Sequence, residues 1–267
     1  MRSVSCELVR SLKIDLLRMF FHSHTGHLAS SLSCIEILSV LYYGMKRNDD
    51  HIILSKGHGA AALYVILANQ GMIAREELLT FYKKNSRLLA LASNTIPGIA
   101  VPTGSLGQGI CFATGVAKAY RMDNQTKRVY CIIGDGEMQE GSVWEAAMFA
   151  GNHNLSNMTV ILDHNKIQAS NNVLNIANVD PISQKWKAFG WNVYEVNGHD
   201  VNEIMEALCD IQECDDRPSI IIANTHKGNG ISFLEDIWDC HMKNPQGDEW
   251  KQVCEAFNIT VEDLESI

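Results

Sequence analysis

The sequence predicts an α/β fold in which a mostly parallel sheet carries helices on both faces. Two apolar runs rich in β-branched residues, 129–133 and 158–163, are typical of buried strands. Segments with apolar residues at helical spacing separate and flank these runs, and a parallel sheet requires such alternation. Both runs end in polar or glycine-containing turns, and in parallel sheets these turns meet at the carboxyl edge, where ligands bind. We therefore expect one domain, 1–267, with a ligand site at that edge.

The composition is that of a soluble globular protein. Of 267 residues, 46% are hydrophobic and 20% are charged, and no long apolar run suggests a membrane span. The amino-terminal stretch alternates charged and apolar residues, unlike a signal peptide, which favours the cytoplasm. A formal charge of −9 without a Lys and Arg cluster argues against nucleic-acid binding. The 8 cysteines form no C-x-x-C pair and are expected to be reduced, buried thiols.

The first half of the chain contains several segments with helical periodicity. In the first of them, Val4, Leu8, Leu12 and Leu16 recur at helical spacing. The serine-rich stretch 30–33 is expected to cap the second helix. The expected elements are one strand, 51–54, and the helices 4–21, 30–43, 60–69, 75–82 and 109–121.

The central stretch carries the most specific chemistry. One predicted strand ends in Gly134-Asp135-Gly136, and the next ends in a turn that contains Asn165. Asp135 offers a carboxylate and Asn165 an amide carbonyl, which are hard oxygen ligands that suit a Mg²⁺ ion shared with a diphosphate. Alone, Gly-Asp-Gly is more often an ordinary turn. The flanking strands and Asn165 favour the ligand-binding interpretation.

The second half continues the alternation of strands and helices. Stretch 169–179 is expected to be a polar loop, and Asp180 is expected to cap a helix that has Pro181 at its first position and ends at Gly190. No element is predicted after Asn258. The other expected elements are the helices 142–153, 200–214 and 248–257 and the strands 191–196 and 218–224.

Several of these motifs together resemble transketolases. GDGEMQEGSVWEAAMFAG (134–151), with Asn165 at the end of the following strand, resembles their thiamine diphosphate motif. SKGHG (55–59), TGSLGQG (103–109) and KGNGISFLED (227–236) are similar to further family motifs, so the resemblance covers nearly the whole chain. It implies a thiamine diphosphate-binding fold, thiamine diphosphate and Mg²⁺ as cofactors, and transfer of a two-carbon ketol unit from a ketose phosphate to an aldose.

The resemblance also implies roles for individual residues. Asp135, Asn165 and the backbone carbonyl of Ile167 are expected to bind Mg²⁺. Three histidines and one glutamate are expected to be catalytic: His27, His58, His241 and Glu140, the last within an acid network at a subunit interface. The expected cofactor contacts are His58, Gly104, Leu106, Asp135, Gly136, Glu137, Asn165 and His241.

The chain departs from the family pattern at several positions. Leu91 or a neighbour stands where transketolases carry a histidine near the substrate's reacting carbons, and Ala100 replaces a glutamate. Leu28-Ala29 replaces Pro-Gly after His27, and Met242 replaces a glycine after His241. Apolar side chains in place of polar contacts should change which donor or acceptor the site accepts.

The resemblance implies that a second chain supplies the pyrimidine-binding domain of the cofactor site. The expected enzyme is an α2β2 heterotetramer with two copies of each subunit, acting on small sugar phosphates. Two alternatives stay open: ketol or acyl transfer to an unusual acceptor in a specialised biosynthetic pathway, and a non-catalytic partner subunit that keeps only the fold.

Overall fold

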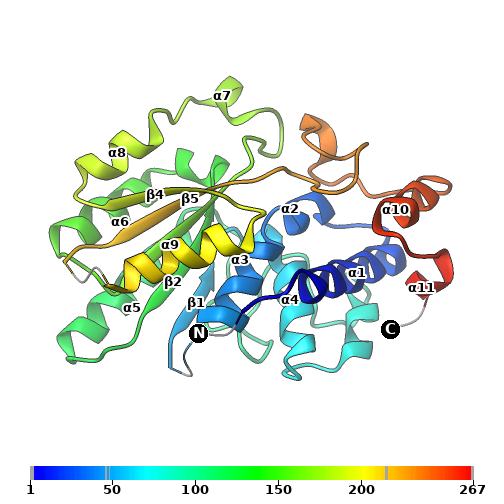
Figure 1. Ribbon diagram of the computed structural model, residues 1–267, viewed down its shortest axis with the longest axis horizontal. Coiled ribbons are helices and arrows are strands. Elements are labelled where there is room, and N and C mark those ends of the chain that lie inside the picture. The colour runs from blue at the N-terminus through cyan, green and yellow to red at the C-terminus, as the bar shows by residue number, and fades with distance from the viewer. Residues whose placement is uncertain (1–2, 46, 48, 214–215, 266–267) are drawn as a thin grey trace.

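Five parallel strands form one sheet in the order β1-β2-β3-β5-β4 in a computed structural model, which describes residues 3–45, 47, 49–213 and 216–265 (Figure 1). All pairings within this sheet are parallel, so the predicted fold class is confirmed. The strands are β1 (His51–Leu54), β2 (Val129–Gly134), β3 (Met158–His164), β4 (Asn192–Asn197) and β5 (Ser219–Asn224).

Helices cover both faces of the sheet and build two apolar cores. Alternate residues of β2 point to opposite faces: Tyr130 and Ile132 join one core, and Cys131 and Ile133 join the other. The first core packs against α1–α4, α9 and α10, and the second packs against α5, α6 and α8. The α-helices are α1 (Cys6–Ser23), α2 (Leu28–Leu32), α3 (Ile35–Ser39), α4 (Ala60–Asn69), α5 (Gln108–Met122), α6 (Gly141–Asn152), α7 (Val173–Ile176), α8 (Ile182–Ala188), α9 (Val201–Glu213), α10 (Glu249–Phe257) and α11 (Val261–Glu265).

The helix predicted over 30–43 is divided into three pieces, α2, α3 and the π-helix η1 (Val40–Met45). The prediction that serines 30–33 cap it is wrong, because α2 already begins at Leu28. Two of these serines bond elsewhere: the Ser31 hydroxyl donates to the His27 carbonyl at 3.0 Å, and the Ser33 hydroxyl donates to Asp163 at 2.6 Å. A buried carboxylate on β3 therefore fixes this segment beside the sheet.

Other predicted boundaries also differ. Segment 75–80 is a 3₁₀ helix, η3 (Arg75–Thr80), and not an α-helix. Asp180 does not cap α8, because the helix begins at Ile182 and Pro181 stands at its N-cap position. The structure adds α7 within the predicted loop and α11 near the carboxyl end, each anchored by one buried side chain, Val173 and Leu264 respectively. The remaining short 3₁₀ helices are η2 (Gly57–Gly59), η4 (Gly136–Gln139) and η5 (Trp238–Cys240).

The cysteines of the described residues are free thiols, as expected. Cys6 and Cys111 are nevertheless exposed and Cys209 is half-buried, so the prediction that all thiols are buried is wrong at these positions. Cys214, the predicted last residue of the helix 200–214, lies outside the described residues. Among the described residues, no helix combines the length and apolar content needed to cross a lipid bilayer.

Candidate functional site

A cavity of about 340 Å³ opens at the carboxyl edge of the sheet, beside the ends of β2 and β3. Every predicted site residue except Glu140 lines it, although these residues come from segments far apart in the sequence. The lining residues are His27, His58, Leu91, Gly104, Leu106, Gly134, Asp135, Gly136, Glu137, Asn165, Ile167, Gln168, Ala169, Ser170 and His241.

The three predicted magnesium ligands lie together in this cavity. Gly134 pairs with Asp163, so Asp135 and Asn165 follow neighbouring strand ends. The Asp135 carboxylate accepts the N–H of Gly136 at 2.7 Å and that of Lys166, whose left-handed backbone turns the chain toward it. The Asn165 amide oxygen accepts the Ile167 N–H at 3.1 Å. Asp135, Asn165 and Ile167 thus line one cavity at the sheet edge.

Asp135 is buried, and its surroundings destabilise the ionised form of its carboxyl group. Burial and the neighbouring Asp163 raise its pKa to about 6. A divalent cation beside it would remove this penalty, because the cation's charge favours the ionised form. The residue is therefore suited to binding a metal ion.

Three histidines form a cluster across the cavity. The His27 ring lies 4.9 Å from that of His241 and 5.8 Å from that of His58, and the last two rings are 5.5 Å apart. Burial, with the nearby Lys227, lowers the pKa of His27 to about 4 and that of His241 to about 3, and burial with Lys56 lowers the pKa of His58. All three are therefore neutral near pH 7. Each can donate from one ring nitrogen and accept at the other.

Lys227 joins this cluster to the metal-ligand turn, a role that the sequence interpretation missed. Its ammonium donates to the Ile167 carbonyl at 3.0 Å and lies 3.1 Å from Nδ1 of His241. Burial lowers the pKa of Lys227 to about 8. The signal was present in KGNGISFLED, which matched the family motif without a role for its lysine. Ile167 thus lines the cavity, and its carbonyl already accepts one hydrogen bond, so its role as a metal ligand stays a prediction.

A fully buried ion pair lies next to the strand ends at the cavity, and the sequence interpretation did not predict it. Lys56, from the SKGHG motif, bonds the Asp163 carboxylate, and both side chains are 0% exposed. Burial opposes both charges, but each partner favours the ionised form of the other, so the pKa of Lys56 is raised and that of Asp163 is lowered. Ser33 and Thr225 also donate to Asp163. This network fixes the strand ends that carry Asp135 and Asn165.

Glu137 lines the cavity, but its carboxylate is occupied by protein donors. It accepts the Ser55 hydroxyl, the Gly107 N–H at 2.9 Å and the Gly134 N–H at 3.1 Å. Burial raises its pKa. The contacts connect the TGSLGQG loop to the end of β2. Glu137 therefore positions the loop that brings Gly104 and Leu106 to the cavity.

Two further positions matter for the predicted site. Glu140 is exposed and lies outside the cavity, beside the Gly107 backbone, so its role in an acid network stays a prediction. Leu91 lines the cavity and packs so closely on Gly104 that a side chain added there would come within 2.5 Å of it. The apolar residue noted in the sequence thus lies at the site itself.

The residues fit a diphosphate-bearing cofactor with Mg²⁺. Hard oxygen ligands on Asp135 and Asn165 match the preference of the ion. Nδ1 of His27 is buried and has no hydrogen-bond partner among the described residues, which leaves a polar atom for a ligand to satisfy. Gly104, at φ +152, keeps the opposite wall free of a side chain.

Comparison with known proteins identifies the relatives of this chain. Residues 1–263 match the family described as "Transketolase, thiamine diphosphate binding domain". A subunit of the apulose-4-phosphate transketolase of Phocaeicola vulgatus is 33% identical over 259 residues, covering 94% of this chain and 92% of that protein. The 6-deoxy-6-sulfo-D-fructose transketolase subunit SqwG of a Clostridium species is 39% identical, covering 85% and 86%. Human transketolase is 37% identical, but the match covers only 38% of its length.

Solved structures agree with this relationship. The transketolase of Campylobacter jejuni superposes with a TM-score of 0.88 at 30% identity, covering 96% of this chain and 43% of that one. The transketolase of Leishmania mexicana, at 24% identity, shows the same fold with a TM-score of 0.87. The chain therefore corresponds to under half of a full-length transketolase.

Proposed function

Because this chain belongs to the transketolase family, as its thiamine diphosphate-binding domain, we propose that it is the diphosphate-binding subunit of a two-chain enzyme. The enzyme transfers a two-carbon ketol unit from a ketose phosphate to an aldose. The observation that carries the proposal is the convergence of Asp135, Asn165 and three neutral histidines on one cavity at the sheet edge.

In this proposal Asp135, Asn165 and the Ile167 carbonyl hold Mg²⁺, and the ion anchors the diphosphate. His58, Gly104, Leu106 and Gly136 surround the cofactor, whose thiazolium ring serves as an electron sink for ketol transfer.

The histidines would act by hydrogen bonding. Neutral imidazoles can donate to or accept from substrate hydroxyls while they remain uncharged, so no imidazolium charge must be desolvated. Lys227 holds His241 in place through its ammonium and adds a positive charge near the anionic cofactor.

A second chain is part of the proposal. Relatives that this chain matches over most of their length are named as subunits of transketolases, which supports a partner that contributes the pyrimidine-binding side of the cofactor site. We propose an α2β2 heterotetramer in the cytoplasm, with Glu140 at the subunit interface, where its exposure in the isolated chain leaves it free to contact the partner.

Reconstitution tests the proposal. The full chain is mixed with a candidate pyrimidine-binding chain, thiamine diphosphate and Mg²⁺, and the mass of the complex and the turnover of ketose phosphates are measured. A complex with turnover that needs both chains supports the function. Cofactor binding by the complex without turnover of any ketose contradicts ketol transfer, and failure to bind cofactor leaves only the non-catalytic role.

One observation favours a second candidate, transfer to an unusual acceptor. Leu91 places an apolar side chain in the cavity, and Leu91 or a neighbour stands where the resemblance puts a histidine near the reacting carbons. A phosphosugar hydroxyl would find no side-chain hydrogen-bond partner at this position, which forgoes the roughly 0.5–1.5 kcal/mol that a hydrogen bond contributes. An acceptor with an apolar group there would be preferred.

The substitution Leu91→His tests this candidate. If Leu91 sets acceptor choice, the variant should gain kcat/KM for a phosphorylated aldose by about tenfold, the equivalent of one regained hydrogen bond. Leu89→His, at another exposed leucine outside the cavity lining, is the matched control. If kcat/KM for the phosphorylated aldose is unchanged or lower in Leu91→His while cofactor binding is intact, the role of Leu91 is contradicted.

A further inference from the structure

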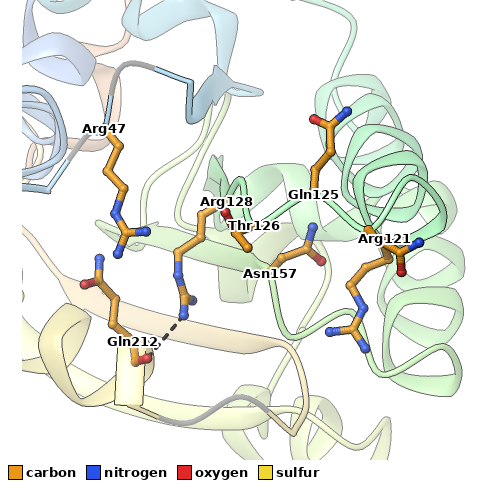
Figure 2. Close-up of a pocket in the computed structure, with 8 residues that line it drawn as sticks. Arg47, Arg121, Gln125, Thr126, Arg128, Asn157 and Gln212 are labelled. Carbon is orange, nitrogen blue, oxygen red and sulfur yellow. Dashed lines mark hydrogen bonds between the residues drawn. The ribbon is translucent and has the colours of Figure 1, made fainter.

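A second cavity, of about 480 Å³, lies at the opposite, amino-terminal edge of the sheet (Figure 2). Arg128 and Asn157 stand directly before β2 and β3, and Gln212 belongs to the last turn of α9. Because the strands are parallel, this cavity and Asp135 lie at opposite ends of the strands. The lining residues are Arg47, Arg121, Asn124, Gln125, Thr126, Arg128, Asn157 and Gln212.

The cavity is positively charged although the protein as a whole is acidic. Its lining has three arginines and, among the described residues, no carboxylate. Asp50 contacts two of the lining residues, but its oxygens accept the backbone N–H groups of Arg47 at 3.1 Å and Arg128 at 2.9 Å. None of the ion pairs between described residues includes a lining arginine. These guanidinium charges are therefore available to a ligand.

The arginines are only partly used for structure. One nitrogen of Arg128, Nη2, donates to the Gln212 carbonyl at 3.2 Å, and Arg121 donates to the Ser156 hydroxyl at 2.9 Å. Among the described residues, Arg128 Nη1 is buried without an acceptor, and the Arg47 guanidinium has no hydrogen-bond partner. Figure 2 shows the Arg47 and Arg128 side chains extending in the same direction, toward Gln212. Two guanidinium groups with free donors thus face one region of the cavity.

A buried acceptor is also unmet. Asn157 is 8% exposed and donates through its amide nitrogen to the Ala117 carbonyl at 3.0 Å. Its Oδ1 atom is buried and has no hydrogen-bond partner among the described residues. An anion alone cannot satisfy this oxygen, whereas a hydroxyl group can. Free donors and a free acceptor in one cavity call for a ligand that carries both an anionic group and hydroxyls.

From this geometry we propose that the amino-edge cavity is a second ligand site, which binds a phosphorylated polyhydroxy compound. Arg47 and Arg128 bind the phosphoryl oxygens, for which the planar guanidinium is the best-matched side chain. Asn157 accepts a hydroxyl, and Gln125 and Thr126 offer further polar contacts. No aromatic ring lines the described part of the cavity, which disfavours nucleotides, since these usually stack their bases. The site stands apart from the carboxyl-edge cavity and does not depend on its function.

Calorimetric titration of the full chain tests the site. The chain is saturated with thiamine diphosphate and Mg²⁺, so that inorganic phosphate cannot occupy the diphosphate position of the carboxyl-edge cavity, and then titrated with ribose 5-phosphate, inorganic phosphate and ribose; the variants below assign the binding to one cavity. We expect saturable binding of ribose 5-phosphate, weaker binding of inorganic phosphate and none of ribose. Inorganic phosphate binding as tightly as the ester contradicts the role of Asn157.

Variants locate the binding. Arg47→Gln should weaken binding of ribose 5-phosphate by about tenfold, the effect of losing a hydrogen bond to a charged group, and adding Arg128→Gln should weaken it further. Arg47→Gln alone is the decisive variant, because its guanidinium has no described structural contact and the fold should be unaffected. Arg87→Gln, an exposed arginine elsewhere that makes the same change in charge, should leave binding unchanged. Absence of saturable binding, or equal binding by Arg47→Gln and wild type, overturns the proposal.

Discussion

The two cavities at opposite edges of the sheet differ in whether their charged side chains are bonded to other protein groups. At the carboxyl edge, Lys56, Asp163 and Lys227 are buried and bonded to other protein groups, and the pKa values of the nearby histidines are lowered. At the amino edge, Arg47 is exposed and Arg128 keeps a free donor. The first cavity is thus fixed before any ligand arrives, whereas the second leaves its charges to be satisfied by one.

This difference shows that charged side chains can serve either the stability of the fold or the binding of a ligand. A buried, paired charge stabilises one arrangement of the chain and is costly to disturb. A charge with free donors adds little to the fold but adds affinity for an anion. The following predictions test this contrast, from the largest expected effect to the smallest.

Breaking the buried ion pair should have the largest effect on stability. Lys56→Met removes one partner and leaves Asp163 as an unpaired buried carboxylate, so the free energy of unfolding should fall by about 3–5 kcal/mol. Urea unfolding followed by circular dichroism measures this loss.

The control is the double variant Lys56→Met/Asp163→Asn. It removes both charges and keeps an oxygen that can accept from one of the two hydroxyls, Ser33 or Thr225, so it should be more stable than Lys56→Met alone. A double variant that is less stable than the single one would show that the pair is not the origin of the loss.

The histidine cluster predicts an intermediate effect, a loss of stability in mild acid. The pKa of His27 is about 4 in the folded chain, below the ordinary value of 6.5, so the unfolded chain binds more protons between these pH values. Its contribution to the free energy of unfolding is complete above pH 6.5 and is lost as the pH falls toward 4. His58 and His241 act in the same direction, while Asp135, with a raised pKa of about 6, opposes them.

Urea unfolding of the cofactor-free chain between pH 7.5 and 4.5 measures this dependence. His27→Gln removes one of the titrating groups, so its stability should fall less steeply over this range than that of the wild type. His153→Gln, at an exposed histidine outside the cavity, should keep the wild-type slope. An equal or steeper slope in His27→Gln would show that the half-buried His27 does not have a lowered pKa.

Arg47→Gln should have the smallest effect on stability, in contrast to Lys56→Met. The Arg47 side chain is exposed and its guanidinium has no described partner, so the free energy of unfolding should change by less than about 0.5 kcal/mol. The same urea experiment measures it. A loss above about 1 kcal/mol would assign Arg47 to the fold and weaken the contrast between the two edges.

The sequence could predict what depends on local patterns. Strand 129–133 and the helix around Leu12 follow from periodicity, and Asp135 and Asn165 follow from turns after adjacent strands. The ion pair of Lys56 and Asp163 could not be predicted, because its partners are 107 positions apart.

The misplaced helix cap has the same origin. Serines 30–33 satisfy local capping rules, but Ser33 bonds a carboxylate 130 positions away, and this long-range contact decides where the segment lies. The arginine cavity likewise assembles residues from separate segments, each of which is ordinary in the sequence. Local patterns thus predicted the strands and the turns, and the supporting contacts required the fold.

The assignment of the carboxyl-edge cavity is tested most directly by titrating thiamine diphosphate into the full chain and its partner, with Mg²⁺ and with a chelator, for wild type and Asp135→Asn. We predict saturable binding that needs Mg²⁺ and is weakened by about 100-fold or more in Asp135→Asn, since losing even an outer-shell partner of a bound metal costs about 10–100-fold. Asp216→Asn, at an exposed aspartate, should bind as the wild type does. Binding that is independent of Mg²⁺, or equal in Asp135→Asn and wild type, would contradict the assignment.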